Sequence, residues 1–139
     1  MDNEWECVVV GGGAAGLSAA LVLGRARRRT LLIDAGGQSN RAAHGIGGLL
    51  GFDGVPPAEL YARGRRELER YPSVEVRDGE VRAAAAGDGI TLDLADGAGV
   101  HTRRLLLATG MRYDYPDLPG LAPLWGRSVF HCPFCHGWE

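Results

Sequence analysis

The feature that most constrains this chain is a glycine pattern directly after a short apolar run near the N-terminus. Val8, Val9 and Val10 are β-branched, as is typical of a strand buried on both faces of a parallel sheet. A Gly-x-Gly-x-x-Gly pattern begins at Gly11, and apolar residues at helical spacing then predict a helix over residues 14–27. Such glycines allow a sharp turn, close approach of a pyrophosphate and tight helix packing. The pattern therefore predicts an anion site at the N-terminus of the helix.

A second strand carries an acid at the distance that a dinucleotide site requires. Thr30–Asp34 is apolar and ends in the carboxylate of Asp34, 23 residues after Gly11. That carboxylate is expected to accept hydrogen bonds from a ribose. The alternative is a glycine-rich turn that binds nothing, but strand, turn, helix and acid occur here together. The sequence therefore predicts a bound adenine dinucleotide.

Length, charge and cysteine content narrow the class of protein. The 139 residues suffice for one modest core, and a net charge of −2 gives no reason to expect nucleic acid or an anionic membrane as partner. The sequence shows no signal-like N-terminal segment and no bilayer-spanning run, so we expect a cytoplasmic protein without a permanent structural disulfide. Cys7 lies within the first strand and is interpreted as a buried, inert thiol.

A long glycine-rich loop, residues 35–57, follows the second strand, and loops of this length are usually functional. Its polar members could cover a dinucleotide, and they are Gln38, Asn40, Arg41 and His44. His44 is also compatible with a solvated position, which we favour. A second helix begins at Pro57 and ends before Pro72. Its charged residues, Arg65 among them, are expected to face solvent.

Short strands broken by Gly-containing turns follow and predict a small antiparallel meander. The expected strands are Val74–Val76, Glu80–Ala85, Ile90–Leu94 and Val100–Thr102. A buried strand then begins at Arg104 and ends in Ala108-Thr109-Gly110, at the sheet edge where ligands bind in doubly wound folds. The predicted fold is α/β: a Rossmann-like parallel sheet with an inserted antiparallel β-meander.

Cys132 and Cys135 have Cys-x-x-Cys spacing and are flanked by His131 and His136. A redox pair needs two close sulfurs and one thiolate, which an adjacent imidazole can help to form. Cys-x-x-Cys-His also attaches c-type haem, but that requires an export signal. A structural zinc site needs four placed ligands and a second ligand cluster is missing, so no metal site is predicted. Two reduced loop cysteines are the third alternative; we favour the redox pair.

Taken in order along the chain, these motifs resemble those of the thioredoxin reductase-like flavoproteins, which are pyridine nucleotide-disulfide oxidoreductases. The set comprises Gly11–Gly16, Asp34, Gly37-Gln38, Ala108–Gly110 and Cys132-Pro133-Phe134-Cys135. The resemblance implies that the dinucleotide is FAD, held in a GR2-type FAD-binding fold with Ala108–Gly110 as a second contact. It also implies NAD(P)H as a redox partner, and a homodimeric full-length enzyme.

The resemblance assigns roles within the cysteine region. Cys135 would lie nearer the flavin and form the charge-transfer thiolate, while Cys132 would exchange with the substrate. His136 stands where thioredoxin reductases usually carry an Asp as general acid, and it would donate and accept the proton. The run from Cys132 to Glu139 is more similar to a branch of bacterial pyridine-nucleotide/FAD oxidoreductases and to dithiol oxidases that close disulfides in natural products such as gliotoxin and holomycin.

The resemblance also implies an organisation longer than this chain. Residues 1–115 would be the N-terminal part of the FAD-binding domain, and residues 116–139 a linker and the start of a second, NAD(P)-binding-type domain. The leading hypothesis is a FAD-dependent thiol–disulfide oxidoreductase that passes electrons between NAD(P)H, FAD, the cysteine pair and a small-molecule or protein disulfide. The alternatives are a dithiol oxidase that uses FAD and O₂, and a non-catalytic FAD-binding half of a split or truncated protein.

The candidate catalytic residues are Cys132, Cys135 and His136. The candidate cofactor-binding residues are Gly11, Gly13, Ala14, Ala15, Gly16, Asp34, Ala35, Gly37, Gln38, Asn40, Val81, Ala108, Thr109 and Gly110.

Overall fold

The computed structural model describes residues 5–138. Glu139, the last residue of the cysteine-containing run, lies outside the described residues. The elements, of which η1 and η2 are short 3₁₀ helices, follow one another as β1 (Cys7–Val10), α1 (Ala14–Arg25), β2 (Thr30–Asp34), η1 (Ser39–Ala42), α2 (Pro57–Leu68), β3 (Val74–Asp78), β4 (Val81–Gly87), β5 (Gly89–Leu94), β6 (Gly99–Thr102), β7 (Leu105–Leu107), η2 (Ala122–Leu124) and α3 (Pro133–His136).

The core of the fold is a parallel sheet of strand order β3-β2-β1-β7, and β4-β5-β6 form a separate antiparallel sheet. β1 is central, with Val8 in register with Leu31 of β2 on one side and with Leu105 of β7 on the other. The antiparallel strands lie between β3 and β7 in the chain. The predicted α/β class and the inserted meander are therefore confirmed.

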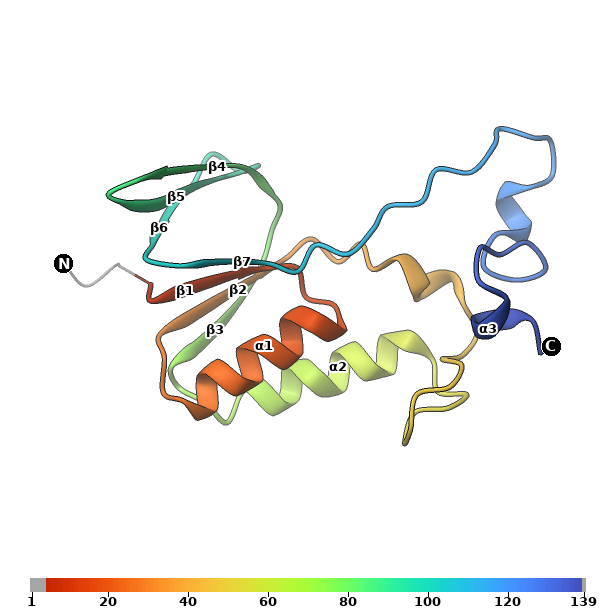
Figure 1. Ribbon diagram of the computed structural model, residues 1–139, viewed down its shortest axis with the longest axis horizontal. Coiled ribbons are helices and arrows are strands. Elements are labelled where there is room, and N and C mark those ends of the chain that lie inside the picture. The colour runs from red at the N-terminus through yellow and green to blue at the C-terminus, as the bar shows by residue number, and fades with distance from the viewer. Residues whose placement is uncertain (1–4, 139) are drawn as a thin grey trace.

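The parallel sheet is the middle layer of three. Figure 1 shows α1 and α2 on one face of it and the meander on the other. Alternate residues of each central strand point to opposite faces, so Val9 and Leu32 pack with the helices while Val8 and Leu31 pack with the meander. Because both faces are covered, β1 and β2 are apolar at almost every position.

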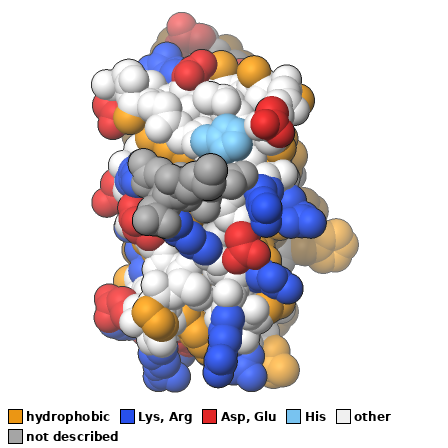
Figure 2. Space-filling view, turned by 90° about the vertical axis from the view of Figure 1, so that its left-hand side faces the viewer, with side chains coloured by type: hydrophobic (Ala, Val, Ile, Leu, Met, Phe, Trp, Pro, Cys, Tyr) orange, Lys and Arg blue, Asp and Glu red, His pale blue; other side chains and the backbone are white. Residues whose placement is uncertain are grey.

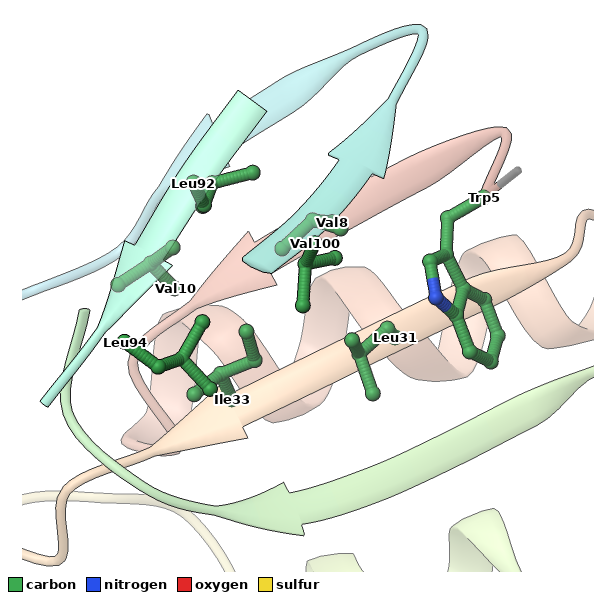
Figure 3. Close-up of a cluster of buried hydrophobic side chains, with 8 residues drawn as sticks. All are labelled: Trp5, Val8, Val10, Leu31, Ile33, Leu92, Leu94 and Val100. Atoms are coloured by element: carbon green, nitrogen blue, oxygen red, sulfur yellow. The ribbon is translucent and has the colours of Figure 1, made fainter. Parts of the chain in front are cut away.

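The layer between the parallel sheet and the meander is a compact apolar cluster (Figure 3). Leu31 and Ile33 from β2 meet Leu92 from β5, and all three are at most 1% exposed. Burying each such side chain contributes about 1.5–3 kcal/mol. The cluster is completed by Trp5, Val8, Val10, Leu94 and Val100. The meander therefore covers one face of the parallel sheet and leaves the ends of the parallel strands free.

One expected meander strand belongs to the parallel sheet instead. Val74–Val76 was expected in the meander, but β3 pairs parallel with β2, with Val74 opposite Thr30 and Val76 opposite Leu32. The reason is the helix before it: α2 forms a crossover that returns the chain parallel to β2, and a short strand cannot be distinguished from a hairpin strand by its own residues.

Two element ends differ from expectation. α1 was expected to reach Arg27 but ends at Arg25, and Arg27 has a positive φ of 57° that breaks the helix. β7 stops at Leu107, so Ala108, Thr109 and Gly110 form a loop rather than the end of a strand. That loop still leaves the sheet at the edge where the ends of β1 and β2 lie.

Figure 2 shows the end of the molecule that faces left in Figure 1, with arginine side chains gathered at its lower part. The three arginines that follow α1, residues 27–29, are exposed. Arg28 forms a 3.2 Å ion pair with Glu6, and the Arg29 guanidinium lies 4.9 Å from the centre of the Trp5 ring. Among residues 5–138, no helix is long and apolar enough to cross a membrane.

Candidate functional site

A cavity of about 670 Å³ opens where β1, β2 and β7 end at the same edge of the sheet. Its size falls within the range of about 300–1,000 Å³ that is usual for small-molecule sites. All the candidate cofactor-binding residues line it except Gly16. The residues that sequence reasoning did not single out there are Val10, Gly12, Ile33, Ser39, Tyr61, Gly79, Glu80, Leu107 and Met111. That the lining residues bind a dinucleotide stays a prediction.

The three fingerprint glycines meet different surroundings. A Cβ atom at Gly16 would lie 1.7 Å from the Gly11 carbonyl oxygen, and one at Gly11, where φ is +109°, would lie 2.2 Å from the Ala108 carbonyl oxygen. Both glycines are therefore required by the packing of the chain itself. At Gly13 the nearest atom is Gln38 Cγ, 3.7 Å away. The space beside Gly13 is thus left for something other than this chain.

The N-terminus of α1 points its unpaired N–H groups at this cavity. The Gly13 N-cap has no side chain to accept them, and the first turn carries no acidic residue. The first bond of the helix runs from the Leu17 N–H to the Gly13 carbonyl, and the structure records no acceptor within residues 5–138 for the N–H groups of Ala14 and Ala15. Both residues line the cavity. This end of the helix fits the negative charge of a pyrophosphate.

Asp34 is the buried acid of the cavity, with only 5% of its surface exposed. Its Oδ1 accepts hydrogen bonds from the Gly12 N–H (3.2 Å), the Gly36 N–H (2.9 Å) and Gln38 Nε2 (3.0 Å). Its Oδ2 accepts from Arg65 Nη2 at 2.6 Å and from Gln38 at 3.3 Å. Burial raises the pKa of Asp34, but the bonds from Gly36, Arg65 and Gly12 outweigh it and hold the pKa below its ordinary value.

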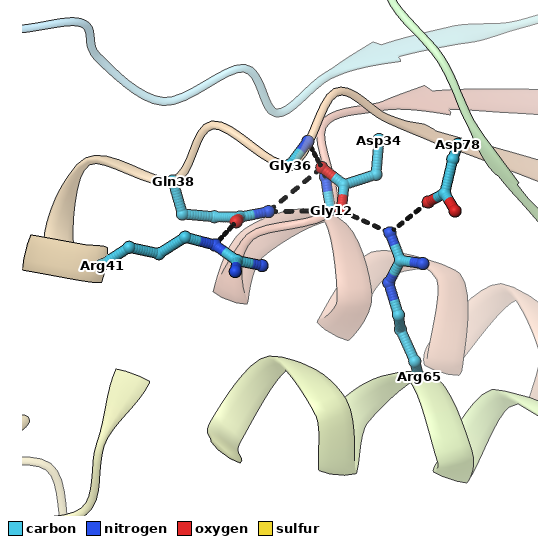
Figure 4. A network of polar contacts seen from close by, with 7 residues as sticks. All are labelled: Gly12, Asp34, Gly36, Gln38, Arg41, Arg65 and Asp78. Carbon is cyan, nitrogen blue, oxygen red and sulfur yellow. Dashed lines mark hydrogen bonds and ion pairs between the residues drawn. The ribbon is translucent and has the colours of Figure 1, made fainter. Parts of the chain in front are cut away.

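Arg65 was expected to face solvent, and the structure corrects this. Its Nη2 bridges two carboxylates, Asp34 at 2.6 Å and Asp78 at 2.8 Å, and its side chain is 33% exposed (Figure 4). Nothing in the sequence of α2 distinguishes Arg65 from its neighbour Arg66. The contact exists because α2 packs beside α1, which brings this turn of α2 under the ends of β2 and β3.

Tyr61 and Gly12 are two further residues of the site that sequence reasoning missed. The Tyr61 hydroxyl donates to Asn40 Oδ1 at 2.6 Å, and the Arg41 guanidinium lies 5.7 Å from the Tyr61 ring centre. Arg41 also donates to Gln38 Oε1 at 2.5 Å, so the loop is tied to both α2 and Asp34. The sequence did contain a signal for Gly12, since three consecutive glycines, residues 11–13, stand at the turn.

The cysteine pair lies in the C-terminal segment. The Cys135 thiol donates to the Cys132 sulfur, with 2.7 Å between the sulfur atoms. This contact lowers the pKa of Cys132, with further help from the backbone N–H groups of Cys135 and Phe134, and it raises the pKa of Cys135. Cys7, by contrast, is buried in β1, and burial raises the pKa of its thiol.

The structure does not bring the cysteine pair to the cavity, since neither cysteine is among its lining residues. After β7 the chain runs toward the right of Figure 1 and passes through η2 before it reaches α3. There α3 packs on the glycine-rich loop, so closely that a Cβ atom at Gly47 would lie 2.9 Å from the Cys135 carbonyl oxygen. That loop connects the two parts of the candidate site.

The two flanking histidines are held by aromatic rings. The His136 ring stacks on Phe130 with 5.6 Å between centres, and both of its nitrogens are buried without a hydrogen-bond partner among the described residues. His131 stacks on Tyr113 at 4.0 Å. His44 is exposed. Over residues 5–138, no group of three or more His, Cys, Asp and Glu side chains is placed to hold a metal ion.

The parallel sheet, the glycine turn and the buried acid define an α/β protein of the dinucleotide-binding class. The chain belongs to the pyridine nucleotide-disulphide oxidoreductase family, which matches residues 5–139. Membership of this family implies FAD as the dinucleotide, and the open space at Gly13 and the free N-terminus of α1 fit that group.

Individual relatives support the same assignment. The chain is 37% identical to the thioredoxin reductase tcpT of Claviceps purpurea, covering 99% of this chain and 44% of that protein. An oxidoreductase from Agrobacterium tumefaciens has 44% identity and a TM-score of 0.93, with 98% of this chain and 46% of the other covered. A thioredoxin reductase TrxB from Bacillus anthracis has 37% identity and a TM-score of 0.92, with 96% and 46% covered. The chain spans less than half the length of each of these relatives.

Proposed function

We propose that the chain is the FAD-binding, cysteine-bearing part of a thiol–disulfide oxidoreductase of the thioredoxin reductase type. The observation that carries this proposal is the cysteine pair, whose sulfurs lie 2.7 Å apart with the pKa of Cys132 lowered and that of Cys135 raised. One sulfur is thus prepared as a nucleophile while the other keeps its proton. Family membership supports FAD and a disulfide substrate as the partners of this pair.

These two pKa directions support the following reaction of the pair with its substrate. The Cys132 thiolate attacks one sulfur of the substrate disulfide, forming a mixed disulfide and releasing the first substrate thiol. The Cys135 sulfur then loses its proton and attacks Cys132, which forms the Cys132–Cys135 disulfide and releases the second thiol. The pair is oxidised by two electrons and the substrate is reduced by two. His136 is the residue that would supply and remove the protons.

The dinucleotide cavity would hold FAD, which would supply the chemistry that restores the dithiol. The N–H groups of Ala14 and Ala15 would bind the FAD pyrophosphate, Asp34 its adenosine ribose, and the Ala108–Gly110 loop the cofactor at the end of β7. Bound FAD supplies two-electron chemistry between a nicotinamide and the dithiol. The candidate residues contribute binding and orientation to that chemistry.

The organisation of the complete enzyme is part of the proposal. We infer that residues 1–115 form the N-terminal part of a FAD-binding domain and that residues 116–139 lead into a second, NAD(P)-binding-type domain. The relatives, which are about twice as long, support this division. NAD(P)H would act through that second domain, in a homodimeric enzyme, with a small-molecule or protein disulfide as substrate.

A dithiol oxidase is the second candidate. It is favoured by His136, which stands after the second cysteine where thioredoxin reductases usually carry an acid. In that case a small-molecule dithiol would reduce the pair, the electrons would pass to FAD, and O₂ would be the final acceptor. The chemistry at the two sulfurs is the same, run in the opposite direction.

An anaerobic titration of the full-length flavoprotein, followed by its visible absorbance, tests the proposal. Bleaching by NADPH supports the reductase, and bleaching by a small dithiol but not by NADPH supports the oxidase. The control is the double variant Cys132→Ser/Cys135→Ser, which should lose bleaching by the dithiol. A flavin that neither reagent bleaches would leave only FAD binding and would contradict both functions.

A further inference from the structure

Arg65 lies behind the acid of the dinucleotide cavity. It projects from α2 toward the ends of β2 and β3, where a single nitrogen, Nη2, lies 2.6 Å from Asp34 Oδ2 and 2.8 Å from Asp78 Oδ1. Figure 4 shows it on the opposite side of the Asp34 carboxylate from Gly36 and Gln38. Asp34 lines the cavity and Arg65 does not. Any effect of Arg65 on a ligand in this cavity therefore passes through Asp34.

The contacts of Asp34 leave one of its oxygens as the acceptor for a ligand. Oδ1 already accepts three N–H donors, at 2.9, 3.0 and 3.2 Å, which exceeds its two lone pairs. Within residues 5–138, Oδ2 accepts only from Arg65 at 2.6 Å and from Gln38 at the longer distance of 3.3 Å. A ribose hydroxyl that displaces Gln38 from Oδ2 would find an acceptor whose position is set by Arg65.

Together with the N–H groups of Gly36 and Gly12, Arg65 also favours the charged form of that acceptor. A carboxylate that is 5% exposed would otherwise lose part of its preference for the ionised form. The guanidinium opposes this effect, and Asp78, which is 81% exposed, holds the guanidinium from the solvent side. Arg65, Asp34 and Asp78 come from α2, β2 and β3, so this set of ion pairs exists only in the folded chain.

We propose that Arg65 is a positioning residue, which fixes and charges Asp34 so that the cavity selects a dinucleotide with free adenosine ribose hydroxyls. This inference rests on the proposed binding of FAD in the cavity. It predicts that Arg65 governs discrimination at the ribose rather than binding in general.

The test compares two ligands on the same protein, FAD and its analogue built from 2′,3′-dideoxyadenosine, which lacks both ribose hydroxyls. In the wild type the analogue should bind about 10–100-fold more weakly, the scale of lost hydrogen bonds to a charged group. In Arg65→Gln this ratio should fall to within about threefold of one. Dissociation constants are measured from the quenching of flavin fluorescence on binding to the apoprotein of the full-length enzyme.

The control is Arg66→Gln, which removes the same charge from the next position of α2, where the side chain is exposed. It should keep the wild-type ratio, and Arg65→Lys should keep part of it because one ammonium group can replace the single bridging nitrogen. If Arg65→Gln weakens both ligands equally and leaves the ratio unchanged, Arg65 is only structural and the inference is wrong. A wild-type protein that binds neither flavin would instead contradict the proposed function.

Discussion

The backbone N–H of Gly12 donates a hydrogen bond to Asp34 Oδ1 over 3.2 Å, and a Cβ atom at position 12 would lie 2.3 Å from the Asp34 carboxyl carbon. The turn after β1 and the end of β2 are thus packed directly against each other. The second residue of the glycine pattern has to be a glycine here because the carboxylate occupies the space of its side chain. This contact makes the glycine turn and the acid one unit, and it leads to the first prediction.

Gly12→Ala should destabilise the protein, because the added methyl group pushes the Asp34 carboxylate away from its hydrogen-bond donors. A loss of about 1–3 kcal/mol in the free energy of unfolding is expected, as for overpacking of a tight site. Urea unfolding followed by circular dichroism measures it. The control is Gly37→Ala, since no atom lies within 4 Å of a Cβ at that position. An unchanged unfolding midpoint for Gly12→Ala would show that Asp34 can move without cost.

Gly13→Val should leave the fold intact and abolish flavin binding. Gly13 has an extended backbone with φ −80° and ψ −168°, which valine accepts, and its nearest neighbour is 3.7 Å away. The side chain would therefore occupy the space that we propose for the FAD pyrophosphate. The measurement is the flavin content of the purified protein together with its melting temperature. The matched control is Gly87→Val, at an exposed position of the meander. Full flavin occupancy in Gly13→Val would contradict the assignment of this space to the pyrophosphate.

Asp34→Asn should remove a pH-dependent part of the stability. The pKa of Asp34 is lowered in the folded state, so its contribution is fully present above the unfolded pKa of about 3.9 and is lost as the pH falls through the folded pKa. The wild type should exceed the variant by about 1.5–3 kcal/mol at pH 7, and this difference should shrink below about pH 4. Urea unfolding between pH 3 and 7 tests this. A difference that is independent of pH would mean that the charge of Asp34 contributes nothing.

Cys132 should be alkylated before Cys135 in the reduced protein. Its lowered pKa gives it the larger thiolate fraction at pH 7, and the thiolate is the reacting form. Iodoacetamide labelling, followed by mass spectrometry of the peptides, compares the two rates. Cys135→Ala removes the thiol donor and should slow the reaction of Cys132, while buried Cys7 serves as the unreactive internal reference. Faster labelling of Cys135 would reverse the roles assigned to the pair.

His136→Ala should slow dithiol–disulfide exchange by about 10²–10⁴-fold, the range for a lost general acid–base group. FAD binding should hardly change, because His136 does not line the cavity. Single-turnover reduction of a small aromatic disulfide by the reduced full-length enzyme provides the rate. His44→Ala, in the exposed part of the loop, is the control. Full exchange activity in His136→Ala would show that solvent supplies the proton instead.

Most of the first half of the fold could be predicted from local sequence. The valine run, the glycine spacing and the apolar run up to Asp34 correctly predict β1, α1 and β2. These elements depend on side-chain burial and turn chemistry within a few residues, which are properties that the sequence carries locally. The same local information was insufficient at Val74–Val76. Three residues that alternate between apolar and polar do not reveal whether the strand pairs with the strand that follows it or with a strand much earlier in the chain.

The sequence by itself therefore determined the identity of the chemical groups: the glycine turn, the acid at position 34 and the two cysteines. Only the tertiary structure decided which groups act together. Arg65 and Asp34 are 31 residues apart, and their 2.6 Å contact depends on how α2 packs against α1 and the sheet. Long-range packing likewise places the segment that carries Cys132 and Cys135 against the glycine-rich loop, outside the cavity. Contacts between distant segments depend on the packing of the whole chain, and local patterns do not record them.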